Sequence, residues 1–159
     1  ILFFCSRHNK NLMMQFTNRT LIVLMIFSFG SIFGQQKPAD FVKTFFEDFH
    51  LQDTTQLAAH FTNEAVMKSI SKDETGQTRI ASVEIDRFVR SIGSIPSDRK
   101  FEEKILAYEV QEDDLMAQVW TPYEFYVNQK LSHTGVNVFV LSKVNKEWKI
   151  VFLIDTRYR

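Results

Sequence analysis

The sequence predicts an α+β domain in which a curved antiparallel sheet wraps around N-terminal helices and forms a cone with a cavity. Residues 115–127, 131–144 and 147–155 are three successive segments rich in aromatic and β-branched residues, which is typical of long strands. Apolar residues recur at helical spacing in residues 38–51 and 85–92. The 159-residue chain also contains 16 Phe, enough for one core of its own.

The segment at residues 38–51 is typical of an amphipathic helix. Pro38 suits its first turn, where a backbone N–H is not needed. The apolar side of this helix comprises Phe41, Val42, Phe45, Phe46 and Phe49. Asp53 is a good N-cap, so a second short helix is expected over residues 54–61.

A short hairpin and a third helix are expected next. The hairpin strands are residues 66–71 and 78–83, which flank a turn-forming segment. The helix opens at Ser82 or Val83 and ends at Gly93. Its apolar residues at i, i+3, i+4 and i+7 are Ile85, Phe88, Val89 and Ile92.

A strand over residues 101–111 precedes the three long strands and completes the order ααββαββββ. Helices on one face of a long antiparallel sheet give the α+β class. A curled sheet closed by one long helix leaves a cavity at its open end, where ligands are often bound. Pro122 implies an edge position or a bulge in its strand.

Residues 1–34 have the pattern of a secretory signal peptide, with a polar stretch that contains Arg19, an apolar run and small residues before the expected cut. The run at residues 21–33 is shorter than the roughly 20 apolar residues that span a bilayer. We therefore expect cleavage near Gly34, one mature domain over residues 35–159, and export to a periplasm or out of the cell. An uncleaved N-terminal anchor is the alternative.

Charge and cysteine content argue against several functions. The mature chain keeps 16 basic and 19 acidic side chains, a net charge of about −3, which does not favour nucleic acid or an anionic membrane as a partner. Cys5 is the only cysteine and lies in the removed segment. The sequence has no Gly-rich phosphate loop, HExxH motif or Asp-rich calcium loop, so we expect no cofactor and no metal.

Four segments carry a family resemblance: FVKTFFEDFHLQDTTQLAAHF, AQVWTPYEFYV, GVNVFVLSK and EWKIVFLIDT. They resemble the nuclear transport factor 2-like superfamily of α+β cone proteins, also called SnoaL-like, and within it small exported bacterial proteins without an assigned activity. The resemblance implies the cone fold. It does not select a function, because the superfamily includes ketosteroid isomerases, polyketide cyclases, dehydratases, association domains and transport adaptors.

Alternation assigns the residues of the two central strands to faces. Every second residue from Ala117 to Phe125 shares one face, and so does every second residue from His133 to Leu141. If these faces line the cone, Tyr123, His133 and Asn137 project into it. The apolar row on the other face comprises Thr134, Val136, Val138 and Val140. This row predicts either a homodimer packed back to back through the sheets or burial within the monomer.

The candidate catalytic residues are His133, Tyr123 and Asp155. His133 can transfer a proton near neutral pH, or it can be a hydrogen-bonded structural residue near a strand end. Asp155 can orient His133 or act as a base, or it can form an ion pair with Arg157 or Arg159. Strict alternation places Asp155 on the face that points away from the cone, unless a bulge intervenes.

The candidate ligand-binding residues are Asn137, Phe139, Trp120 and Phe45. Aromatic rings stack on a flat ligand and an amide fixes its orientation, although aromatic residues more commonly belong to the core. The acidic residues at positions 102–103 and 109–114 are expected to form a solvated face.

These patterns favour an exported binding domain for a small apolar or aromatic ligand, without catalysis. The alternatives are a cofactor-independent acid–base enzyme of the isomerase, cyclase or dehydratase type, and a dimerising association module.

Overall fold

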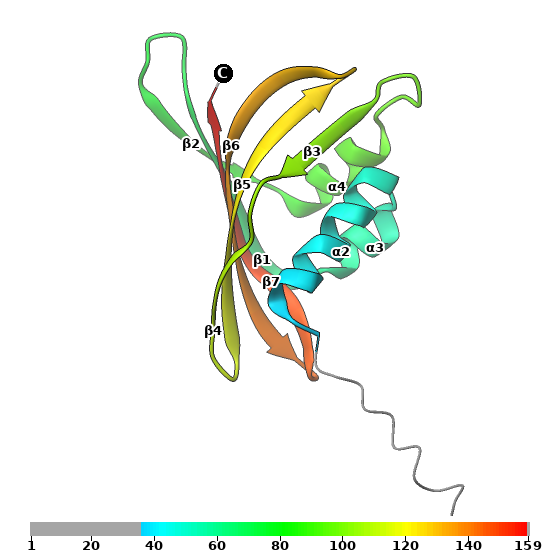
Figure 1. Cartoon of the computed structure of the whole chain (residues 1–159), viewed down its shortest axis with the longest axis vertical. Coiled ribbons are helices and arrows are strands. Elements are labelled where there is room, and N and C mark those ends of the chain that lie inside the picture. Colours follow the sequence, from blue (N-terminus) through cyan, green and yellow to red (C-terminus); the bar gives the residue numbers. More distant parts are fainter. Residues whose placement is uncertain (1–35, 159) are drawn as a thin grey trace, which may run out of the picture. The chain divides into compact units, whose positions relative to one another are not determined.

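In the computed structural model, which describes residues 36–158, three helices cover one face of a curved sheet (Figure 1). They are α2 (Pro38–Leu51), α3 (Thr54–Ala59) and α4 (Ile85–Gly93). The Asp53 side chain accepts hydrogen bonds from the backbone N–H groups of Thr55 and Gln56, which caps α3 as predicted. α4 begins at Ile85, slightly later than predicted, because strand pairing includes the residues before it.

Within the described residues, seven strands form one open sheet. They are β1 (Phe61–Lys72), β2 (Thr78–Val83), β3 (Phe101–Ile105), β4 (Glu109–Glu112), β5 (Met116–Val127), β6 (Lys130–Val144) and β7 (Glu147–Tyr158). Their order across the sheet is β2-β1-β7-β6-β5-β3, and β4 also pairs with β5. The α+β class is confirmed. The sheet is mixed rather than wholly antiparallel, because β7 runs parallel to β1.

The predicted strand at residues 101–111 is two strands, β3 and β4, which pair with different parts of β5. The break lies opposite Pro122, whose carbonyl oxygen accepts a hydrogen bond from the Leu106 N–H. Proline has no N–H to return the second bond of the pair, so the ladder is interrupted there. Pro122 therefore separates β3 from β4 and determines where the pairing of β3 with β5 ends.

Two tight turns connect β5, β6 and β7, where the sequence predicts turns. Asn128 and Gln129 have φ angles of 49° and 65°, and Asn145 and Lys146 have φ angles of 52° and 72°. Two-residue turns with positive φ at both positions match the twist of antiparallel strands. They fix the pairing of β5 with β6 and of β6 with β7 next to each turn.

A β-bulge at Val151 exchanges the two faces in the second half of β7. Ile150 and Phe152 pair with adjacent residues of β6, so the intervening Val151 has no partner there. After the bulge, Leu153 and Asp155 lie on the buried face together with Ile150. Strict alternation is therefore wrong for Asp155, and the bulge turns its carboxylate toward the helices.

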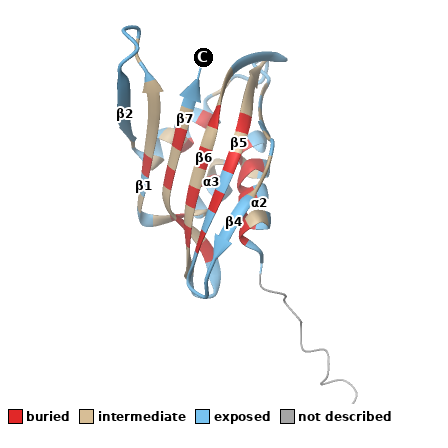
Figure 2. Cartoon of the chain, turned by 60° about the vertical axis from the view of Figure 1, so that its left-hand side comes forward, coloured by how far each residue is buried: buried red, intermediate tan, exposed pale blue. Residues whose placement is uncertain are grey.

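Phenylalanines of α2 fill the interior between the helices and the sheet. The buried rings are Phe41, Phe45, Phe46 and Phe49. Phe45 and Phe46 both contact Phe139 of β6, with ring centroids 5.3 and 5.7 Å apart. Figure 2 shows buried residues recurring along β5, β6 and β7. Burial of one such ring contributes roughly 2–3 kcal/mol, so α2 is a major source of stability for the sheet.

The sheet face opposite the helices, here called the outer face, is largely apolar. Its central residues are Val66, Trp120, Pro122, Val136, Val138, Val140, Phe152 and Ile154. All of them are half-buried or exposed, and Trp120 is 40% exposed. Figure 1 shows the helices on the other side of the sheet only.

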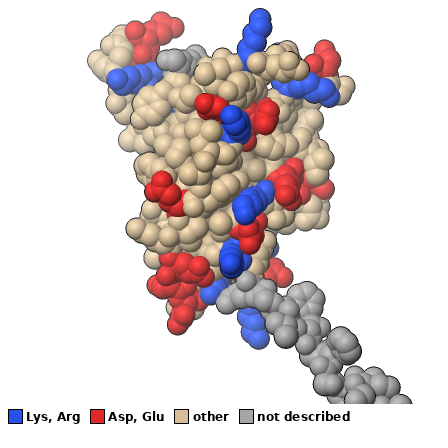
Figure 3. Space-filling view, viewed as in Figure 1, with Lys and Arg blue, Asp and Glu red and all other residues tan. Residues whose placement is uncertain are grey.

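Charged side chains of both signs are interspersed on the face seen in Figure 3. The acidic residues at 109 and 112–114 are exposed around the turn between β4 and β5, as expected for a solvated face. Glu103 does not belong to that face, because its ladder partner is Phe125, which is on the helix-covered side of the sheet.

Residues 36–158 belong to one compact unit. The predicted signal peptide and Cys5 lie in residues 1–34, outside the described residues. Within the described part of the chain, no helix is long and apolar enough to cross a membrane.

Candidate functional site

A cluster of polar side chains lies on the inner face of the sheet, the face that the helices cover. It comprises Glu103 of β3, Thr121 and Tyr123 of β5, Asn137 of β6, and Asp155 and Arg157 of β7. The ladder pairs Thr121 with Asn137 and Asn137 with Asp155, so these three residues form one row across the central strands. We call the six residues the polar cluster. Four separate strands contribute to it, which makes its geometry a property of the whole sheet.

Two charge-assisted hydrogen bonds hold the carboxylates of the cluster. The Asn137 amide donates from Nδ2 to Oε1 of Glu103 over 2.8 Å. The Arg157 guanidinium donates from Nε to Oδ2 of Asp155 over 2.6 Å. Asp155 is 5% exposed and Asn137 is 6% exposed. An ionised carboxylate buried to this degree needs such partners, and Arg157 supplies the opposite charge.

Gly135 makes room for Tyr123 to cross β6. The Tyr123 hydroxyl donates to the backbone carbonyl oxygen of Thr156 over 3.0 Å and lies 3.5 Å from Oδ2 of Asp155. A Cβ atom added at Gly135 would lie 2.8 Å from the Tyr123 ring and would collide with the Thr156 carbonyl oxygen. Only glycine therefore allows the tyrosine to reach β7 from β5.

The pKa of Glu103 is raised to about 7. Burial is the main cause, and the nearby Asp155 carboxylate raises the pKa further, whereas the Asn137 hydrogen bond and the Arg157 charge lower it. A carboxyl group that titrates near neutrality can both accept and donate a proton at physiological pH. Glu103 is thus the group of the cluster best suited to proton transfer.

Tyr123 is held in its neutral form. Burial raises its pKa most, followed by the charges of Asp155 and Glu103. The hydroxyl is therefore a hydrogen-bond donor at every pH at which the fold is expected to survive.

Two buried oxygens of the cluster lack a hydrogen-bond partner in the described structure. They are Oδ1 of Asp155 and Oγ1 of Thr121, both in the same row of the sheet. An unpaired buried acceptor costs about 1–3 kcal/mol, and more if it is charged. Such atoms are unusual in native proteins and often mark a place where a ligand or water supplies the missing bond.

The two histidines near the cluster have different roles. His133 is half-buried and stacks on Phe125, with ring centroids 4.9 Å apart, and its Nδ1 lies 3.2 Å from the Ser132 hydroxyl. It also meets the Tyr123 ring edge-on, with centroids 5.8 Å apart. His50 of α2 accepts the backbone N–H of Glu103 at Nε2 over 2.9 Å. Burial lowers the pKa of His50, which keeps that nitrogen available as an acceptor.

Three of the sequence-predicted ligand-binding residues do not face an open cavity at the cluster. Phe45 and Phe139 are buried against each other in the core, because α2 lies directly on the sheet. Trp120 lies on the outer face, one residue out of phase with Thr121 and Tyr123. Asn137 is the fourth, and it belongs to the polar cluster together with Tyr123 and Asp155.

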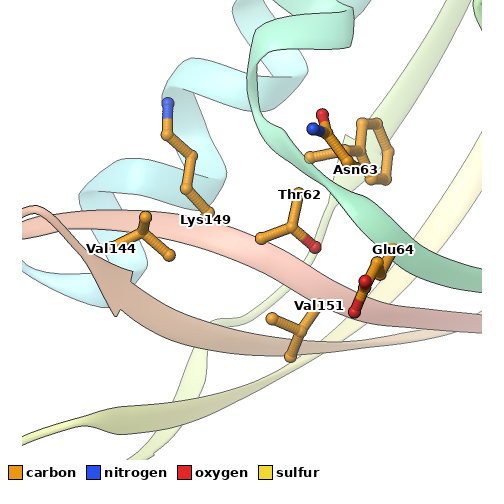
Figure 4. A pocket seen from close by; sticks show the side chains of 7 residues that line it. Thr62, Asn63, Glu64, Val144, Lys149 and Val151 are labelled. Atoms are coloured by element: carbon orange, nitrogen blue, oxygen red, sulfur yellow. The ribbon is translucent and has the colours of Figure 1, made fainter.

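A hollow of about 650 Å³ lies elsewhere, where β1 and β7 separate. Residues 62–65 of β1 have no ladder partner on β7 opposite the bulge at Val151, and Figure 4 shows side chains from both strands around the gap. The Lys149 ammonium there already donates to the carbonyl oxygen of Ala59 over 2.9 Å. This hollow follows from a backbone irregularity and presents no buried unpaired polar atom, unlike the polar cluster.

Among residues 36–158, no group of three or more His, Cys, Asp or Glu side chains is placed to hold a metal ion.

No protein-family model and no curated protein matched the sequence. Solved structures do match. A nuclear transport factor 2-like protein with a cystatin-like fold from Novosphingobium aromaticivorans aligns over 91% of this chain and 91% of its own, with 9% identity and a TM-score of 0.60. The chain has the cystatin-like fold of nuclear transport factor 2-like proteins. At this level of identity, the match establishes the fold alone.

Other solved structures with the nuclear transport factor 2-like fold have different descriptions. One is a candidate dehydratase from Streptomyces avermitilis, with 14% identity, a TM-score of 0.56, and coverage of 75% of this chain and 91% of that one. Another is a candidate calcium/calmodulin-dependent protein kinase II association domain from Xanthomonas campestris, with 18% identity, a TM-score of 0.55, and coverage of 76% and 84%. The fold is therefore compatible with either an enzyme or an association domain.

Sequence reasoning did not single out Glu103 or Thr121 as members of the cluster, whereas the ion pair of Asp155 with Arg157, one of its alternatives, is present. Glu103 was expected on a solvated face, but the alternation of Phe101, Glu103 and Ile105 places it between two apolar residues on the inner side. That pattern was a usable signal.

Proposed function

We propose that this chain is a small-molecule-binding domain whose ligand site is the polar cluster. The observation that carries the proposal is the unpaired Oδ1 of Asp155, in the same sheet row as the unpaired hydroxyl of Thr121, with Asn137 between them. A ligand that donates hydrogen bonds removes the free-energy cost of both atoms when it binds. Preformed sites of this kind combine an apolar wall with a few convergent polar groups.

The ligand is polar at the end that enters the cluster. An apolar ligand in the interior would have to displace Phe45 and Phe139, which already pack at close range. The half-buried rings of Phe101, Phe125 and His133 lie next to the cluster and can contact the apolar part of a ligand.

Chemical-shift mapping tests this proposal. The ¹⁵N-labelled chain is titrated with a panel of small neutral, cationic and anionic fragments, and the backbone amides together with the Asn137 side-chain amide are followed. We expect at least one fragment to shift the amides of Tyr123, Asn137 and Asp155, and to lose this effect in Asn137→Leu. Val138→Thr, which changes the outer face of the same strand, should keep it. Shifts confined to the hollow between β1 and β7, or none at all, would contradict the proposal.

A second candidate function is cofactor-independent acid–base catalysis, favoured by the pKa of about 7 at Glu103. In such a reaction the Glu103 carboxylate takes a proton from the carbon next to a substrate carbonyl. The Tyr123 hydroxyl would donate to the developing oxyanion, and Glu103 would return a proton afterwards. His133 and Asp155 adjoin these groups and remain candidate partners.

Hydrogen–deuterium exchange tests the catalytic candidate. The chain is incubated with a panel of simple ketones in D₂O, and loss of the signal from the protons next to the carbonyl is followed by NMR. Catalysed exchange that is lost in Glu103→Gln and kept in Glu102→Gln would support it. Exchange at the uncatalysed rate for every ketone would contradict the catalytic proposal. It would not affect the binding proposal.

We also propose that the chain is exported and that it forms a homodimer through the outer face. The export proposal is supported by the signal-peptide pattern of residues 1–34. The dimer is supported by the apolar outer face, which none of the helices in residues 36–158 covers. If the polar cluster binds no ligand, we propose instead that the chain is an association module that dimerises through the outer face.

A further inference from the structure

We propose that the polar cluster takes an organic cation, whose ammonium group donates hydrogen bonds to Asp155, Thr121 and Glu103. This inference rests on the proposed binding function and specifies its ligand class. Two features of the cluster support a cationic ligand. The first is its set of unpaired hydrogen-bonding atoms, and the second is its net charge.

Tyr123, Asn137 and Arg157 each donate one hydrogen bond within the protein. The Tyr123 hydroxyl donates to Thr156, the Asn137 amide donates to Glu103, and the Arg157 Nε donates to Asp155. Two buried oxygens lack a partner, namely Oδ1 of the Asp155 carboxylate, which accepts, and Oγ1 of the Thr121 hydroxyl, which can accept or donate. A ligand group that only donates hydrogen bonds can pair with both of these oxygens. An ammonium group has up to three donors and no acceptor.

The net charge of the cluster also favours a cationic ligand. Asp155 and Glu103 are both acidic, and Arg157 is the one basic side chain hydrogen-bonded within the cluster. With Glu103 ionised, the cluster carries one net negative charge in a poorly solvated place. A cation restores neutrality, whereas a carboxylate or phosphate ligand would add repulsion.

Thr121 provides an observation independent of the acidic residues. Its side chain is fully buried, its hydroxyl has no partner in the described structure, and the ladder fixes it beside Asn137. A hydroxyl in the sheet interior is normally satisfied. Its position in line with Asp155 puts two unpaired oxygens in one row of the inner face, with Asn137 between them.

The partly exposed side of the cluster is the side toward β3. Glu103, Phe101, Phe125 and His133 are half-buried, whereas Thr121 and the core behind it are closed. An ammonium group would therefore enter past β3 and the aromatic rings, with the rest of the ligand remaining over those rings. The Arg157 side chain is about half exposed at the opposite strand and stays paired with Asp155.

Cation binding is coupled to the protonation of Glu103. The groups that face this carboxyl are Asp155 and Arg157 from β7, Tyr123 from β5, His133 from β6 and His50 from α2. A bound ammonium group favours the ionised form of Glu103, so binding near neutral pH releases a proton. With the Glu103 pKa at about 7, the ionised fraction rises about tenfold from pH 6 to pH 8, and the apparent affinity rises with it.

Calorimetry with three matched probes tests the inference. Benzylamine, benzyl alcohol and benzoate have the same ring and differ in charge, and each is titrated into the chain at pH 6, 7 and 8 in two buffers of different ionisation enthalpy. We expect benzylammonium to bind, with a Kd that falls about tenfold from pH 6 to pH 8 and with proton release at pH 7. Glu103→Gln should abolish both the pH dependence and the proton release. Glu102→Gln, on the exposed side of β3, should retain them.

Two outcomes would overturn the inference, and they separate it from the proposed function. If benzyl alcohol or benzoate binds as tightly as benzylammonium and its binding is lost in Asn137→Leu, the site binds small molecules but does not select cations. If none of the three binds at millimolar concentration, the cation inference is wrong, and the fragment mapping described above decides separately whether the cluster is a ligand site. An affinity for benzylammonium at pH 8 that is unchanged in both Asp155→Asn and Glu103→Gln would also contradict it.

Discussion

Glu103 shows how position alone changes the chemistry of a residue. Its neighbour Glu102 lies on the exposed side of β3 and is solvated, whereas Glu103 points inward to Asn137 and Asp155. Burial favours its neutral form, so ionisation in the folded state costs free energy that the unfolded chain does not incur.

The stability of the fold should therefore depend on pH through Glu103. Its folded pKa of about 7 lies above the ordinary value of 4.5. Between these values the folded state binds more protons than the unfolded state, so stability is full below about pH 4.5 and falls as pH rises toward 7 and above. Glu103→Gln should lose this contribution to the slope and should be more stable than the parent at pH 8. Thermal unfolding at pH 5 and pH 8 measures it, with Glu102→Gln as the control that keeps the parent slope.

Gly135 should not tolerate a methyl group. A Cβ at this position collides with the Thr156 carbonyl oxygen and crowds Tyr123, so either β7 or the tyrosine must move. We expect Gly135→Ala to destabilise the fold by about 3 kcal/mol, the upper part of the range for overpacked sites. Gly76→Asn is the control, because Gly76 has open space around it and asparagine accepts its positive φ. Equal urea midpoints for the two variants would contradict this account of the tyrosine.

At the scale of elements, the sequence predicts the type and order of most helices and strands, but not where two strands are interrupted. Periodicity locates α2 and α4, and proline and cap residues locate their starts. The break between β3 and β4 depends on a proline in a different strand, Pro122. The bulge at Val151 depends on pairing across β6 and β1.

The missed bulge explains most of what the sequence could not provide about the site. Tyr123 and Asn137 were placed on the correct face because β5 and β6 alternate without interruption between them. Asp155 and Arg157 lie beyond the bulge, where counting by two gives the wrong face. Sequence periodicity is local, whereas a bulge is set by the partner strand, so no pattern within β7 alone reveals it.

α2 should act as a packed element of the core rather than as the wall of an open cavity. Phe45 is 2% exposed and contacts Phe46, Phe61 and Phe139. Phe45→Ala should cost roughly 3–5 kcal/mol, as expected for a large ring removed from a core that cannot collapse. Glu47→Ala, on the exposed side of the same helix, should change stability by less than about 0.5 kcal/mol. A small effect at Phe45, measured by urea unfolding, would mean that the interior is open to solvent or ligand.

At the scale of the whole molecule, the two faces of the sheet differ in what covers them. The inner face is covered by α2, α3 and α4, and the outer face carries a continuous apolar surface centred on Val138. Contiguous apolar surfaces of soluble proteins usually mark an interface, which supports the proposed dimer.

The proposed dimer should separate when the outer face becomes charged. We expect the chain to sediment at twice its own mass and Val138→Lys to sediment as a monomer, because a lysine at the centre of an apolar interface would be buried without a partner. Ser132→Lys, at an exposed position near the start of β6, should remain dimeric. A parent chain that is monomeric at micromolar concentration, or a dimeric Val138→Lys, would rule out this interface.

The central claim is that the polar cluster is built around a carboxyl group that titrates near neutral pH. A ¹³C NMR titration of the Glu103 side-chain carboxyl carbon, assigned by its absence in Glu103→Gln, measures this directly. We expect a titration midpoint near pH 7 for Glu103. Addition of benzylammonium should shift this midpoint to lower pH. A midpoint near the ordinary value of 4.5 would mean that Glu103 is solvated like its neighbour, and that the cluster holds neither a proton carrier nor a charge for a cation to neutralise.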